Sequence, residues 1–166
     1  EGTGLPLDAI FLTCTHSHTA PYAKSVTDDP LIAEYTQMIK RRFVDATKYA
    51  LDDLKPAHLG WGIGNAPNIA FVRRFRMKDG SVRTNPGVNN PDILHPIGDI
   101  DERVTVLRFD RENDSIVLVN FGDHPDVVGG NLISGDWPAL TRDVVEKVLD
   151  NTKCICTNGA QGDVNH

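Results

Sequence analysis

Two histidines that are two positions apart, His16 and His18, are the residues of this sequence best suited to chemistry. They follow the apolar run 9–12, where the sequence changes to polar and turn-forming residues. Side chains at i and i+2 of an extended chain point to the same face, so both imidazoles can reach one ligand. A third histidine, His124, follows a second apolar run, 116–119. Because imidazole is a common zinc ligand, this layout predicts that the three residues share a zinc or substrate site at neighbouring strand ends.

Each of these features also has an alternative explanation. His-x-His segments also occur as pairs of solvated loop histidines. The glycines of residues 159–163 can bring backbone N–H groups close to a developing oxyanion, or they can simply form a tight turn. Asp136 precedes a predicted helix and can either cap it or face the histidines as a carboxylate.

Four segments resemble motifs of the neutral, non-lysosomal ceramidase family and occur in the same order. Residues 15–21 resemble the family's Thr-His-Thr-His-Ser-Gly-Pro, and residues 120–125 resemble its second zinc-histidine segment. Residues 134–136 are similar to its Ser-Asp step, and residues 159–165 to its Ser-Asn-x-Gly-Asp-Val-Ser. The resemblance implies that residues 1–166 are an N-terminal portion of a zinc-hydrolase catalytic domain that splits the fatty amide of ceramide, as in sphingolipid metabolism.

Site roles follow from this resemblance. It implies that His16 and His124 are zinc ligands and that His18 orients a ligand or transfers a proton. Arg73 or Arg74 falls near the family's Asn-Arg step, which contacts the substrate. These arginines also alternate with phenylalanines, a mixture that can hold an oxyanion or carboxylate against apolar walls.

The catalytic segment departs from the family at one position. Asp163 matches the family's Gly-Asp-Val, but Asn165 stands where the family has its proposed catalytic serine. The asparagine favours direct attack by a metal-bound water, and its amide can still donate a hydrogen bond to an oxyanion.

The family takes its remaining zinc ligands, a Glu and a Tyr, from sequence further downstream. We therefore expect the remainder of a longer polypeptide to complete the site, and we expect this chain alone to bind zinc weakly or not at all.

The functional prediction is a zinc-dependent hydrolase of linear amide bonds, with N-acylsphingosine or a related amide as substrate. Two alternatives remain open, a hydrolase of a non-lipid amide and a non-catalytic binding module. The net charge of −6 argues against a nucleic-acid partner, and no apolar run reaches the length of about 20 residues that a membrane span needs. The family resemblance allows a secreted protein, whereas an odd number of cysteines, 3, favours the cytoplasm.

The pattern of elements predicts an α/β fold, a single domain whose mixed β-sheet is flanked by helices. The hydrophobic content of 40% is enough for a real core in a chain of 166 residues. Residues 65–101 are rich in Asn, Pro and Gly and predict a long loop that covers the site. The predicted elements are a buried strand at 8–15, a helix from Pro30 to about residue 54, a strand at 58–63, a hairpin of 104–109 with 116–121, a helix from Asp136 and a strand at 153–157.

Overall fold

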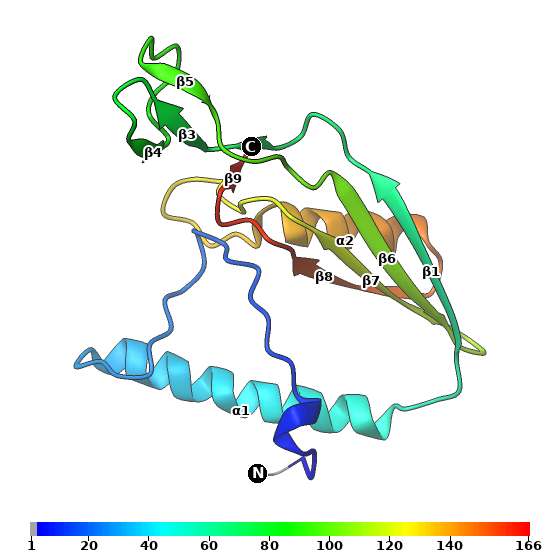
Figure 1. Ribbon diagram of the computed structural model, residues 1–166. Helices are drawn as coiled ribbons and strands as arrows, with labels where there is room; N and C mark the ends of the chain where they lie inside the picture. The colour runs from blue at the N-terminus through cyan, green and yellow to red at the C-terminus, as the bar shows by residue number, and fades with distance from the viewer. Residues whose placement is uncertain (1–2) are drawn as a thin grey trace. The chain divides into compact units, whose positions relative to one another are not determined.

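The computed structural model describes residues 3–166 and has a mixed α/β architecture. Two helices accompany three sheets, of which the largest has four strands (Figure 1). The chain separates by its contacts into two compact units. One contains the segment that ends at Leu12 together with Ala20–Pro56, and the other contains Thr13–Thr19 and Ala57–His166. The mixed α/β class is confirmed, while the single domain stays a prediction.

The first unit is built around the helix α1 (Pro30–Asp52). Asp29 caps it, because its Oδ1 accepts hydrogen bonds from the backbone N–H groups of Leu31 and Ile32 at 2.9 and 3.3 Å. Pro30 stands at the first helical position, where a missing N–H costs nothing. The helix predicted from Pro30 is confirmed.

The strand predicted at residues 8–15 is wrong. A short 3₁₀ helix, η1 (Leu7–Ala9), occupies its start, and irregular chain follows, in which Phe11 is 90% exposed. An apolar run of four residues does not determine a strand, because a strand also needs a neighbour to satisfy its backbone N–H and C=O groups. The strand-helix-strand order predicted for 8–15, Pro30 to about residue 54, and 58–63 therefore lacks its first strand.

The main sheet lies in the second unit and has the order β1-β6-β7-β8. The two pairs β1/β6 and β6/β7 are antiparallel, and β7/β8 is parallel, so the sheet is mixed as predicted. Helix α2 (Asp136–Val148) connects the parallel pair. The strand bounds are His58–Asn65 for β1, Arg103–Asp110 for β6, Ser115–Phe121 for β7 and Thr152–Asn158 for β8, which confirms the predicted hairpin and both outer strands.

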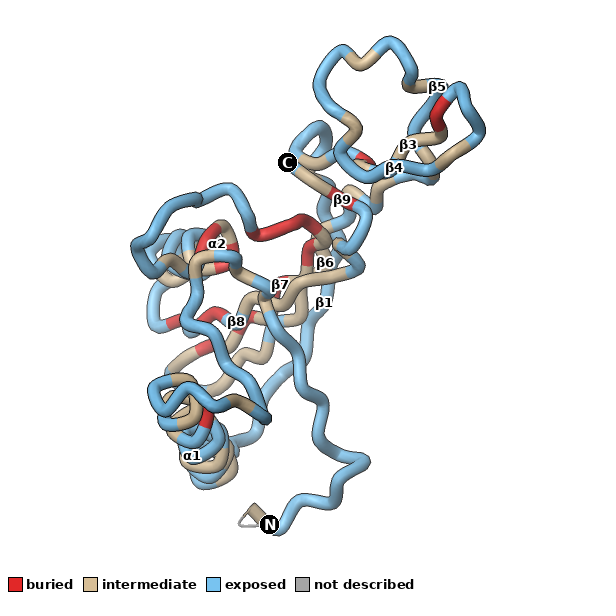
Figure 2. Tube along the Cα trace, turned by 90° about the vertical axis from the view of Figure 1, so that its left-hand side faces the viewer, coloured by how far each residue is buried: buried red, intermediate tan, exposed pale blue. Residues whose placement is uncertain are grey.

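The core lies between this sheet and α2. Val117 and Val119 of β7 alternate with less buried neighbours and form a buried cluster with Cys154 of β8. Val145 of α2 packs against this cluster. The buried residues concentrate on β7, β8 and the chain that follows β7 (Figure 2). This packing gives β7 and β8 a rigid base, and their adjacent C-terminal ends carry the residues described below.

The segment 65–101 is less irregular than predicted. It contains four short strands, because the Asn and Gly residues in it mark turns between them, with positive φ at Asn68, Asn85 and Asn89 among others. Three of the strands form a sheet of order β4-β3-β5, and β2 pairs with β9 near the end of the chain. Their bounds are Phe71–Val72 for β2, Arg74–Met77 for β3, Val82–Thr84 for β4, Ile93–Pro96 for β5 and Val164–Asn165 for β9.

No helix in the described part of the chain has both the length and the apolar character that crossing a membrane requires.

Candidate functional site

The segment Thr13–Thr19, which carries two of the histidines, is fastened to the second unit by hydrogen bonds. Asn158 Nδ2, at the end of β8, donates to the carbonyl of Thr15 at 3.0 Å. The backbone N–H of His18 donates to the carbonyl of Pro125 at 3.2 Å. Ser17 Oγ donates to the carbonyl of Ser134 at 2.9 Å. These bonds hold the segment in place although it contains no strand.

The third histidine is placed by the end of β7 and a close approach of two glycines. Gly159 follows β8 and donates its N–H to the carbonyl of Phe121, the last residue of β7, at 2.8 Å. A Cβ on Gly159 would lie 3.2 Å from the Cα of Gly122, and a Cβ on Gly122 would lie 3.2 Å from the carbonyl oxygen of Ala160, so a side chain at either position would crowd backbone atoms. Asp123 Oδ1 then accepts the backbone N–H of His124 at 2.8 Å, and both residues are buried. His124 is thus fixed just beyond the adjacent C-terminal ends of β7 and β8.

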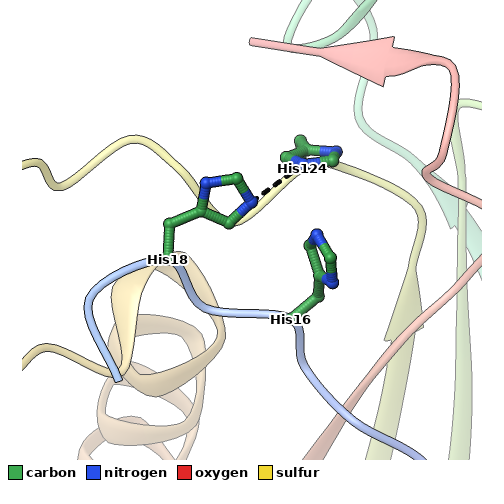
Figure 3. Close-up of side chains that lie close together, drawn as sticks. All are labelled: His16, His18 and His124. Carbon is green, nitrogen blue, oxygen red and sulfur yellow. Dashed lines mark hydrogen bonds between the residues drawn. The ribbon is translucent and has the colours of Figure 1, made fainter. Parts of the chain in front are cut away.

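The three imidazoles converge, as Figure 3 shows. The ring centroid of His16 lies 5.0 Å from that of His18 and 4.9 Å from that of His124, and the remaining pair is also 4.9 Å apart. One nitrogen of each ring lies within 4.8 Å of the others, a grouping that could hold a metal ion. The predicted clustering of the three histidines is confirmed. The reason differs from the prediction, because His16 has φ 67° and the chain there is not extended.

Two of the rings are oriented by acceptors on their outer nitrogens. His124 Nδ1 lies 3.2 Å from the backbone carbonyl oxygen of Gln161. Because a carbonyl can only accept, Nδ1 carries the hydrogen, and Nε2 of the neutral ring presents a lone pair. His18 Nδ1 lies 3.3 Å from Asp126 Oδ1, so the same reasoning applies to this ring. Both Nε2 atoms then face one another across 3.1 Å.

This donor set could hold a metal ion. Two nitrogens bound to one zinc ion at about 2.0–2.1 Å in tetrahedral geometry lie roughly 3.3 Å apart. The two Nε2 atoms, 3.1 Å apart, come close to this separation. Two lone pairs at that distance repel each other unless a cation or a proton lies between them. Three histidines leave the fourth position of a tetrahedral ion open, as catalytic zinc sites do.

The surroundings of His16 favour the neutral form of its ring. The pKa of His16 is lowered, chiefly because burial disfavours the charged imidazolium and then because His124 and His18 repel it. Arg73 acts in the same direction, and the carboxylate of Asp126 opposes it. Neutral imidazole is the form that binds a metal ion. Burial also raises the pKa of Asp123, the neighbour of His124.

The two arginines predicted to contact substrate differ in their surroundings. Arg73 donates from Nε and Nη2 to the carbonyl oxygen of Gly162 at 3.2 and 2.8 Å. Its backbone N–H donates to the carbonyl of Asp163 at 2.8 Å. Arg73 therefore braces the loop that presents the Gln161 carbonyl to His124. Arg74 is exposed and pairs with the neighbouring strand β4. Substrate contact by either arginine stays a prediction.

The predicted catalytic residues Asp163 and Asn165 lie in or just after the segment that Arg73 contacts. The side chain of Asp163 is exposed, and Asn165 is partly buried in β9, where it pairs with Phe71 of β2. Their catalytic roles stay predictions.

Asp136 binds backbone N–H groups at the start of α2. It is the first residue of that helix, and the residue before it is Gly135, which has no side chain to cap the helix. Its Oδ2 accepts the N–H of Val128 at 2.8 Å and its Oδ1 accepts the N–H of Trp137 at 2.6 Å. The residue is 1% exposed and has φ 55°. It fixes the chain between His124 and α2, and it is not part of the histidine group.

Sequence reasoning missed the two groups that orient the rings. Asp126 lies two positions after His124, and that spacing was the only signal for it in the sequence. Gln161 contributes a backbone carbonyl, which the sequence does not reveal.

An apolar cavity lies beside Asp123, the residue before His124. It has a volume of about 390 Å³ and is walled mainly by apolar side chains of β6, β7 and α2, among them Val104, Val119 and Phe121. Asp123, which precedes His124, forms part of its wall. Trp137 also lines it, and its Nε1 is buried without a hydrogen-bond partner among the described residues.

Comparisons with known proteins find similarity in the fold. No protein-family model matches the sequence, and no curated protein matches it. A solved structure of neutral ceramidase from Pseudomonas aeruginosa is similar, with a TM-score of 0.52 and 17% sequence identity. A ceramidase complexed with C2 is similar with a TM-score of 0.53 and 21% identity. Each match covers 75% of this chain but 20% of the ceramidase chain. The chain therefore shares a partial fold with ceramidases, and it brings three histidines together in that fold.

Proposed function

We propose that this chain carries the metal site of a zinc-dependent amide hydrolase, with an N-acylsphingosine or a related N-acyl amide as substrate. The observation that carries the proposal is the convergence of His16, His18 and His124, with ligand nitrogens within 4.8 Å of one another. The fold similarity to ceramidases supports the reaction class.

In this proposal His18 is a third zinc ligand, in addition to His16 and His124. The support is its Nε2 atom, which lies 3.1 Å from that of His124 while its Nδ1 faces Asp126. A proton-transferring His18, with only the other two histidines as ligands, is the competing arrangement. With three local ligands, the chain by itself is expected to bind zinc, in contrast to the expectation from two family-type ligands.

The chemistry that zinc supplies when bound is Lewis acidity, which polarises a carbonyl group and makes water more acidic. The chain's own residues would do the rest. We assign proton transfer to Asp163, whose backbone is held by Arg73. Asn165 would donate a hydrogen bond to the carbonyl oxygen as negative charge develops on it.

The apolar cavity beside Asp123 supports a substrate with an apolar acyl group. Its volume of about 390 Å³ falls within the range of small-molecule sites, roughly 300–1,000 Å³. A hydrolase of short polar amides would have no use for such walls, because burying polar groups there is unfavourable.

The test is an assay of the intact gene product, purified and loaded with zinc, on N-acylsphingosines of increasing acyl length and on short N-acetyl amides. We expect amide cleavage that requires zinc and that is faster for the longer acyl chains. The variants His16→Ala and His124→Ala should be inactive. His95→Ala is the matched control, since His95 is an exposed histidine of β5 outside the group. Cleavage that persists without metal, or in both His16→Ala and His124→Ala, would refute the proposal.

A further inference from the structure

We infer that Asp126 is a positioning residue, which holds the ring of His18 in the tautomer and orientation that turn Nε2 toward the other two histidines. The inference rests on the proposed function, because it assigns a task to Asp126 at the same metal site.

The contact itself points to orientation and not to stability. His18 Nδ1 lies 3.3 Å from Asp126 Oδ1, and the two side chains are 40% and 45% exposed. A contact between side chains as exposed as these contributes little to folding. A hydrogen bond to one ring nitrogen nevertheless decides which nitrogen carries the hydrogen and therefore which one is free to bind.

Asp126 is itself held in a position from which it can orient the ring of His18. Its backbone N–H donates to the carbonyl of His124 at 2.9 Å, which folds the chain tightly at Pro125. Pro125 is buried, and its carbonyl accepts the N–H of His18 at 3.2 Å. The stretch of three residues from His124 thus supplies one ring of the site, a backbone anchor for His18 and a carboxylate for the ring of His18. The ring and its acceptor are held by the same piece of chain.

The arrangement at His18 parallels that at His124. There the backbone carbonyl of Gln161 lies 3.2 Å from Nδ1, and the ring is turned so that Nε2 faces inward. A backbone carbonyl cannot be removed by substitution, but the carboxylate of Asp126 can. Residues that hydrogen-bond to the outer nitrogen of a metal-binding histidine typically change metal affinity by about 10–100-fold when they are replaced.

Without this acceptor, the half-exposed ring of His18 can rotate and can adopt either tautomer. Every ring state in which Nε2 carries the hydrogen or points to solvent is unable to bind. Asparagine at position 126 keeps an acceptor oxygen in the same place, so it should retain most of the effect, whereas alanine should lose it.

The experiment measures two quantities in Asp126→Ala, Asp126→Asn and the parent chain. The first is the zinc dissociation constant, from competition with a chromophoric chelator. The second is the tautomer of His18 in the metal-free chain at pH 8, from nitrogen-15 NMR of the imidazole. Asp143→Ala is the control, because Asp143 is an exposed aspartate of α2 whose carboxylate pairs with the side chain of its neighbour Arg142. The unfolding midpoint of each metal-free variant shows whether the fold is retained.

We expect Asp126→Ala to weaken zinc binding by about 10–100-fold and to shift His18 from the Nδ1–H tautomer toward the Nε2–H tautomer. Asp126→Asn should stay close to the parent in both respects, and Asp143→Ala should match it. The inference is overturned if the parent already has Nε2–H at His18, or if the alanine variant keeps the tautomer and the zinc affinity of the parent. A parent chain that binds no zinc, but loses its Nδ1–H tautomer in Asp126→Ala, would refute the proposed function and leave the positioning role standing.

Discussion

The Nε2 atoms of His18 and His124 lie 3.1 Å apart although 106 positions separate the two residues in the sequence. Each ring is turned by an acceptor on its other nitrogen, an aspartate in one case and a backbone carbonyl in the other. The geometry of the site therefore depends on the residues that orient the rings as well as on the histidines themselves.

Arg73 should act as a brace for the loop that orients His124. Replacing it with alanine removes two hydrogen bonds to the Gly162 carbonyl, and we expect faster amide hydrogen exchange at residues 161–164 with a stability loss of about 1 kcal/mol. Arg74→Ala is the control, because Arg74 is the next residue along the chain and its side chain is exposed on β3. Equal exchange rates in the Arg73→Ala variant and the parent would show that the arginine is free for another role.

A side chain at Gly159 should crowd the backbone of Gly122. An added Cβ would lie 3.2 Å from the Cα and 3.3 Å from the N of Gly122, and backbone atoms cannot move aside as a flexible side chain can. We expect Gly159→Ala to lower the free energy of unfolding by about 1–3 kcal/mol in denaturant titrations. Gly162→Ala is the matched control, since a Cβ there meets open space. A destabilisation as large in the control would mean that the close approach of Gly122 and Gly159 is not the cause.

The cysteines should differ sharply in reactivity. Burial raises the pKa of Cys156 to about 11 and raises that of Cys154, so both are protonated thiols at pH 8, whereas Cys14 is exposed. The thiolate is the reactive form, and alkylation of the native chain at pH 8 should therefore modify Cys14 alone. Labelling of Cys156 should increase as the pH rises toward 11. Peptide mapping by mass spectrometry gives the modified positions, and early labelling of Cys154 at pH 8 would contradict this assignment.

Much of the fold was predictable because its signals are local. The alternation of apolar residues in β7 and the capping aspartate of α1 both identify their elements from adjacent residues. The strand expected at 8–15 is wrong because an apolar run becomes a strand only where another strand pairs with it, and such pairing is a property of the whole chain. The short strands within 65–101 were missed because pieces of two to four residues carry no periodicity that a pattern can reveal.

The site was predictable in its residue types and not in its construction. His16, His18 and His124 were singled out by their position after apolar runs, and they do meet. The turn at His16 and the hydrogen bonds to Asn158 and Pro125, which actually place them, depend on contacts across more than 100 positions. The orientation of the His124 ring depends on the backbone carbonyl of Gln161. Every residue has a backbone carbonyl, so the sequence cannot show which one will serve as the acceptor.

Zinc binding by the 166-residue chain tests the central claim most directly. The measurement is isothermal titration with zinc, followed by metal analysis after dialysis, on the parent and on His16→Ala, His18→Ala, His124→Ala and the control His95→Ala. We predict one zinc ion per chain in the parent and the control, and an affinity at least about 100-fold lower in each of the other three, because losing a ligand should cost more than losing the partner of one. Absence of zinc binding in the parent, or parent-like affinity in His18→Ala, would contradict a site built from these three histidines.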